Sequence, residues 1–106
     1  MVAMNHIHEL SRRIAEEFQP DKIILFGSHA YGVPQEHSDV DLLVIMPFEG
    51  HSTLKAIEIS QRLDASFSLD LLVRTPEKMQ ERLALHDFFL MDIMATGKVL
   101  YEAAHV

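Results

Sequence analysis

The chain has 106 residues, of which 48% are apolar and 24% are charged. A chain of this length forms one domain that buries roughly 65% of the surface its unfolded form exposes, and this composition excludes the disordered and fibrous classes. We therefore expect a single domain over residues 1–106. Because 16 acidic residues outnumber 9 Lys and Arg, the net charge is -7, and we expect no direct binding of nucleic acid.

The chain contains no cysteine, which excludes disulfides and thiolate metal sites. No basic segment leads into an apolar, cleavable stretch near the start of the chain. The longest apolar runs span only a few residues, whereas a membrane-spanning helix needs about 20. These patterns predict a cytoplasmic protein without a membrane segment.

Hydrophobic periodicity predicts helices that alternate with strands along the chain. In chain order we expect an amphipathic helix over 5–18, a strand over 22–26, a short helical turn near 29–31, a strand over 40–45, a helix from Ser52 or Thr53 to about 65, a strand over 67–73, one helical pattern from Pro76 to Gly97 and a strand over 98–101. Together these elements predict an α+β fold in which helices flank a small mixed β-sheet.

Apolar side chains of two helices are expected to fill the core. They are Leu54, Ile57 and Leu63 in the helix after Ser52, and Phe88, Phe89, Met91 and Met94 in the helical pattern before Gly97. For the methionines, a partner-binding surface is the alternative interpretation.

Three aspartates stand out because they interrupt or open apolar strands. Asp39 and Asp41 lie on one face of a strand, about 6 to 7 Å apart, and Asp70 lies within the third predicted strand. If that strand is adjacent, three carboxylates converge, and each pair repels by roughly 2 to 3 kcal/mol at an effective dielectric of about 20. Oxygen-only ligands with open positions suit Mg²⁺, so the pattern predicts a magnesium site.

Gly27 and Ser28 follow the first buried strand. A Gly-Ser pair by itself is most often only a turn. Before a helical turn, however, glycine lets the backbone approach a phosphate and the serine hydroxyl adds a hydrogen-bond donor. Together with the carboxylates, this turn predicts a site for a nucleoside triphosphate.

The ordered set resembles the DNA polymerase beta-like nucleotidyltransferases, whose signature is an apolar strand, Gly-Ser, a spacer and Asp-x-Asp. Here the strand 23–26 leads into Gly27-Ser28, and residues 29–38 separate this turn from Asp39-Val40-Asp41. The chain length narrows the resemblance to the minimal nucleotidyltransferases, single-domain proteins often encoded beside a helical HEPN-type partner. Antitoxin-like members of this family are known for transferring adenylyl groups to that partner.

The resemblance implies a role for each residue of the set. Gly27 and Ser28 would hold the triphosphate of ATP, and Asp39 and Asp41 would bind two Mg²⁺ ions. Asp70 would hold the metal near the attacking hydroxyl and act as a general base. All three aspartates are thus both catalytic and metal-binding candidates.

The chain departs from the family pattern at Tyr31, where many relatives have arginine. The phosphates then lack the cation that arginine supplies. It would have to be replaced by His29, Lys22 or Arg74. Tyr31 therefore favours one alternative, a non-catalytic antitoxin-like binding module.

The resemblance as a whole implies an enzyme of a HEPN/MNT toxin-antitoxin pair that transfers a nucleoside monophosphate, AMP from ATP, to a hydroxyl on its protein partner. A second alternative is a small-molecule adenylyltransferase of the aminoglycoside type, although such enzymes usually need an added helical domain. The acceptor, the base preference and the formation of a homo-oligomer are left open by the sequence.

Overall fold

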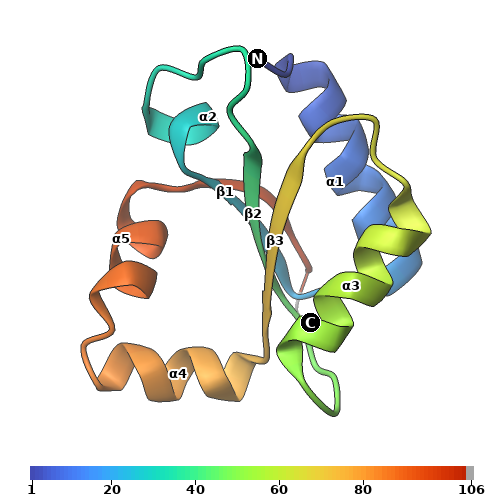
Figure 1. Cartoon of the computed structure of the whole chain (residues 1–106). Helices are drawn as coiled ribbons and strands as arrows, with labels where there is room; N and C mark the ends of the chain where they lie inside the picture. Colours follow the sequence, from blue (N-terminus) through green and yellow to red (C-terminus); the bar gives the residue numbers. More distant parts are fainter. Residues whose placement is uncertain (105–106) are drawn as a thin grey trace.

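Four strands form one mixed sheet in the order β3-β2-β1-β4 in the computed structural model, which describes residues 1–104 (Figure 1). The strands are β1 (Lys22–Phe26), β2 (Val40–Ile45), β3 (Leu69–Arg74) and β4 (Lys98–Glu102). β1 runs antiparallel to both of its neighbours, β2 and β4, whereas β2 and β3 are parallel. The mixed sheet expected from the sequence is confirmed.

Helices cover both faces of this sheet. They are α1 (Met4–Phe18), α2 (Ser28–Tyr31), α3 (Ser52–Leu63), α4 (Pro76–Ala84) and α5 (Phe88–Thr96). In Figure 1, α1 and α3 lie on the right of the sheet, whereas α4 and α5 lie below it and on its left. No helix within residues 1–104 combines the length and the apolarity needed to cross a membrane.

The sheet separates two apolar layers because successive strand residues point to opposite faces. Ile23 and Leu25 of β1 belong to the core layer that α1 and α3 cover. Ile24 and Phe26 belong to the layer beneath α4 and α5. The continuous apolar run of β1 therefore serves both layers, which is why its sequence shows no alternation.

The single helical pattern expected from Pro76 to Gly97 is wrong, because the structure divides it into α4 and α5. Between the two helices, His86 adopts a positive φ of 58°. The Asp87 carboxylate then caps α5 by accepting a hydrogen bond from the Leu90 amide. Apolar spacing continues across this break and so conceals it.

The expected inner face of α3 is only partly correct. Leu63 is buried as expected, but its buried neighbour is Ile59, and Leu54 and Ile57 are exposed. At about 100° per residue, Leu54 lies roughly 140° around the helix from Ile59 and therefore points away from the core. Ser52 or Thr53 was expected to cap this helix, but His51 occupies the N-cap position, and its side chain makes no capping hydrogen bond.

The expected core role of the α5 side chains is also wrong. Leu90 and Ile93 are the buried members of this helix. The four residues expected in the core are exposed to different degrees: Phe88 79%, Phe89 57%, Met91 39% and Met94 38%. Because α5 is a separate short helix that rests on the sheet by one narrow side, most of its apolar surface faces outward.

Candidate active site

The turn after β1 brings bare backbone against an acidic side chain. Gly27 has φ 76° and ψ -159°, a combination that is essentially restricted to glycine. A Cβ atom at this position would lie 2.1 Å from Oδ2 of Asp41. The Asp41 carboxylate therefore lies directly against the Gly27 backbone. Ser28 opens α2 immediately after this contact, where the first amides of a helix have no acceptor within it.

Strand register places two of the aspartates side by side. Asp41 is paired with Phe26 of β1 on one side and with Asp70 of β3 on the other. Directly paired residues share a face of the sheet, so both carboxylates lie on the face that α4 and α5 partly cover. Asp39 lies two residues before Asp41 on the extended approach to β2. The adjacency expected for Asp41 and Asp70 is thus present in the register.

The pKa of Asp41 is raised above its ordinary value, and burial of the carboxyl group is the largest cause. The negative charges of Asp70 and Asp39 raise it further. Three like charges therefore act on one another at this edge of the sheet, and a bound cation would relieve their repulsion.

The donor chemistry of these residues fits Mg²⁺. Carboxylate oxygens are the ligands that this ion prefers, and one or two of them suffice because it keeps water molecules and substrate phosphates as further ligands. Within residues 1–104, no three His, Asp or Glu side chains are already arranged as a metal cage. Of the three carboxylates expected to converge, the structure places Asp41 beside Asp70, and Asp39 is near enough for its charge to affect Asp41.

His29 has a structural role that the sequence did not reveal. Its side chain is 8% exposed, with Nδ1 3.1 Å from the carbonyl oxygen of Asp39 and Nε2 accepting a hydrogen bond from the Val2 amide at 3.3 Å. Both ring nitrogens are thus engaged by backbone groups. His29 therefore offers no free ring nitrogen to a phosphate, and it joins the start of the chain to the strand that carries Asp41.

The other two cations considered as replacements lie at the wrong end of the sheet. Lys22 and Arg74 are both paired in register with Ile45, the last residue of β2. Four strand residues, or roughly 13 Å, separate this end from Asp41. Lys22 also forms an ion pair with Glu102, at 3.1 Å. The structure therefore contradicts both replacements, and the Tyr31 side chain that stands in for arginine is 55% exposed.

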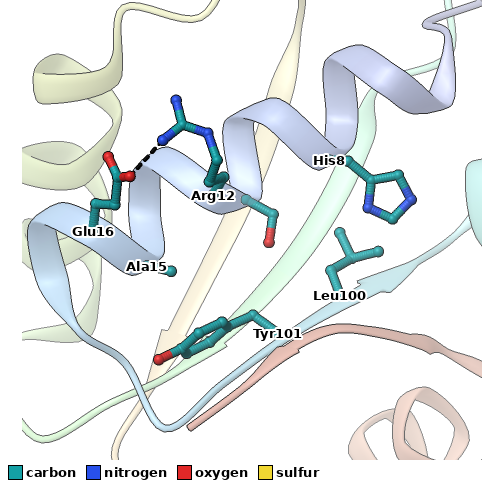
Figure 2. A pocket seen from close by; sticks show the side chains of 7 residues that line it. His8, Arg12, Ala15, Glu16, Leu100 and Tyr101 are labelled. Atoms are coloured by element: carbon teal, nitrogen blue, oxygen red, sulfur yellow. Dashed lines mark hydrogen bonds and ion pairs between the residues drawn. The ribbon is translucent and has the colours of Figure 1, made fainter.

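A hollow of about 440 Å³ lies away from the carboxylates, between α1 and β4. Figure 2 shows Tyr101 and Leu100 on its β4 side and His8 and Arg12 on α1, with Arg12 turned toward Glu16. The Arg12 guanidinium donates hydrogen bonds to Glu16 and to Glu9, so its charge is already neutralised. This hollow therefore offers no free cation to a phosphate.

Comparisons with known proteins find a matching family and similar folds. The family model for the nucleotidyltransferase domain matches residues 7–98. A Sulfolobus solfataricus protein described as a nucleotidyltransferase is 19% identical, with a TM-score of 0.59 over 74% of this chain and 71% of that chain. No curated protein matches this chain.

Two solved toxin-antitoxin structures share the fold. The MntA-HepT toxin-antitoxin pair is 15% identical, with a TM-score of 0.59 over 95% of this chain and 74% of that chain. A toxin-antitoxin structure with AMP-PNP is 21% identical, with a TM-score of 0.57 over 96% of this chain and 75% of that chain. At these identities, the likeness shows the fold.

Proposed function

Because the chain belongs to the nucleotidyltransferase domain family, we propose that it transfers AMP from ATP to a hydroxyl group of a protein partner in a Mg²⁺-dependent reaction. The observation that carries this proposal is the register that places Asp41 beside Asp70, with the Gly27 backbone against the same carboxylate. Acidic ligands for a cation and a turn open to a phosphate are thereby combined at one edge of the sheet.

In the proposed reaction, Gly27 and Ser28 bind the triphosphate through the backbone and the serine hydroxyl. Asp39, Asp41 and Asp70 would hold Mg²⁺, which when bound would offset the negative charge that develops on the phosphates. Asp70 orients the acceptor hydroxyl and accepts its proton. The hydroxyl oxygen forms a bond to the α-phosphorus while the bond between that phosphorus and the bridging oxygen breaks, so pyrophosphate leaves.

A protein acceptor is supported by two observations. Neighbours of this fold are toxin-antitoxin pairs, including MntA-HepT, so we propose a HEPN-type partner for this chain. The net charge of -7 favours a basic partner surface.

A label-transfer assay tests the proposal. The protein is incubated with Mg²⁺, ATP labelled at the α-phosphorus and an extract of the cells that contain the partner, and the labelled product is identified. We expect a labelled protein band with the wild-type protein and none with the Asp39→Ala/Asp41→Ala variant. Glu49→Ala is the matched control, because it removes an exposed acid from the loop after β2, at the opposite end of that strand. This control should retain the transfer.

Other destinations of the label discriminate between the alternatives. Label on a small molecule would replace the protein acceptor with one of the aminoglycoside type while preserving the transferase chemistry. Transfer by wild type no greater than by the double variant would instead support a non-catalytic binding module, the alternative that Tyr31 favours.

A further inference from the structure

An aromatic pair adjoins the carboxylates on the face of the sheet that carries α5. Phe26 is paired in register with Asp41, and Phe89 of α5 packs edge to face with Phe26. The two ring centroids are 5.9 Å apart and the ring planes meet at 86°. Phe89 therefore contacts the residue that is paired with Asp41.

The two rings differ in exposure. Phe26 is 6% exposed and belongs to the core layer under α4 and α5, whereas Phe89 is 57% exposed. Leu90 and Ile93 already attach α5 to the core, so Phe89 is not needed as its anchor. In an edge-to-face contact, Phe26 covers at most one face of the Phe89 ring. The ring is thus held in place by Phe26 and remains available to a ligand.

The charges around the site give this ring added importance. Lys22 and Arg74 lie at the opposite end of the sheet, and backbone groups engage both ring nitrogens of His29. Lys98 is paired with Leu25, whose side chain faces the α1 layer, so this lysine lies on the other face. With these four groups excluded, contacts to the uncharged part of a nucleotide gain weight in its binding.

We propose that Phe89 forms the nucleobase subsite of this domain by stacking its free face on the base of the nucleotide whose phosphates lie at Gly27. This inference rests on the nucleotidyl-transfer function proposed above. Stacking on an aromatic ring tolerates every base, because each base has a π face. The subsite therefore selects nucleotides over bare polyphosphates and discriminates weakly among the bases.

Two probes separate the base from the phosphates in binding experiments. One is ATP with a methylene bridge between the α- and β-phosphorus, which cannot donate AMP, and the other is inorganic tripolyphosphate. Both are titrated with Mg²⁺ into the whole protein by calorimetry. We expect the wild-type protein to bind the ATP analogue more tightly than it binds tripolyphosphate.

Substitutions of α5 then assign that difference to a residue. Phe89→Ala should weaken the binding of the ATP analogue about 5- to 100-fold and leave the binding of tripolyphosphate unchanged. Phe89→Leu, which keeps apolar bulk without a π face, should lose most of the same preference. Phe88→Ala is the matched control, because its ring is 79% exposed and adjacent helix positions do not share a face. It should bind both probes as the wild type does.

A fluorescence measurement provides a second readout. The chain contains no tryptophan, so Phe89→Trp supplies a single reporter in an exposed position. We expect the ATP analogue to change its emission and tripolyphosphate to leave it unchanged.

The outcomes separate this inference from the function on which it rests. The subsite is refuted, while the phosphate site stands, if both probes bind and Phe89→Ala does not weaken the binding of either. The same holds if Phe89→Ala weakens the binding of both probes equally. If neither probe binds to the wild-type protein, the proposed function and the subsite both fail.

Discussion

Replacing Gly27 with alanine tests the contact between the turn and the Asp41 carboxylate. The glycine-only backbone conformation should cost about 1 to 3 kcal/mol of unfolding free energy when a Cβ is added. That Cβ would also lie 2.1 Å from Oδ2 and 3.0 Å from Cγ of Asp41, and overpacking of this kind costs about 1 to 3 kcal/mol more. We therefore expect Gly27→Ala to destabilise the fold by about 2 to 6 kcal/mol.

Two further variants separate the backbone cost from the steric cost. Gly50 also has a positive φ, of 87°, but a Cβ added there meets nothing within 4 Å, so Gly50→Ala reports backbone strain alone. Asp41→Ala removes the two clashing atoms and leaves the Asp41 Cβ, at an ordinary distance of 3.4 Å. In a double-mutant cycle, Gly27→Ala should cost about 1 to 3 kcal/mol less in the Asp41→Ala background.

Urea denaturation followed by far-ultraviolet circular dichroism measures these free energies, provided that the unfolding slope is unchanged among the variants. The reasoning is refuted if Gly27→Ala costs no more than Gly50→Ala. It is equally refuted if Gly27→Ala costs the same with and without the Asp41 carboxylate.

Three other predictions concern charges and hydrogen bonds near the site and in α5. Without divalent cations, Asp41→Asn should raise the free energy of unfolding by about 1 kcal/mol, because it removes one of three like charges. With added Mg²⁺, the wild-type protein should become more stable than the variant. A loss of stability of the variant in metal-free buffer would contradict the repulsion. His29→Ala should lower the free energy of unfolding by about 2 to 4 kcal/mol, because it removes two hydrogen bonds and leaves a cavity. Val2→Pro removes only one donor and should lower it by about 1 kcal/mol. Equal losses in urea denaturation would show that the Asp39 contact contributes nothing. The Leu90 amide and then Arg82 hold the pKa of Asp87 below its ordinary value. The ionised cap therefore stabilises the fold above the pKa of the unfolded state, and this contribution is lost as the pH falls through the pKa of the folded state. Asp87→Ala should reduce the fall of the melting temperature in acid, and an unchanged fall would exclude the cap.

The sequence predicted the features that depend on local pattern. β1 and β2 agree closely with the expected strands because runs of apolar residues mark strands buried on both faces. Those boundaries also place Gly27 directly after β1 and Asp41 near the start of β2. Asp70 was identified as an unusual acid within an apolar strand, and the parallel register of β2 with β3 explains why it lies beside Asp41.

What the sequence did not predict depends on contacts between distant segments. His29 is a buried hydrogen-bonding residue only because Val2 reaches it from the start of the chain, and no local pattern encodes this contact. Lys22 and Arg74 were considered as replacements for the cation missing at Tyr31, but strand direction places both at the far end of the sheet. The division between α4 and α5 depends on the Asp87 cap, a polar signal that hydrophobic periodicity does not weigh.

The parallel register of β2 and β3 also determines where this chain can change length. A slip of one residue between these strands would move Asp70 to the opposite face, among the apolar side chains that pack against α1 and α3. Insertions or deletions within either strand should therefore eliminate the site even where the fold survives. The segment 47–51, exposed except at Phe48, joins β2 to α3 outside the paired residues, and lengthening it leaves the pairing intact. Relatives with this site should vary in length at such loops and keep the strands constant.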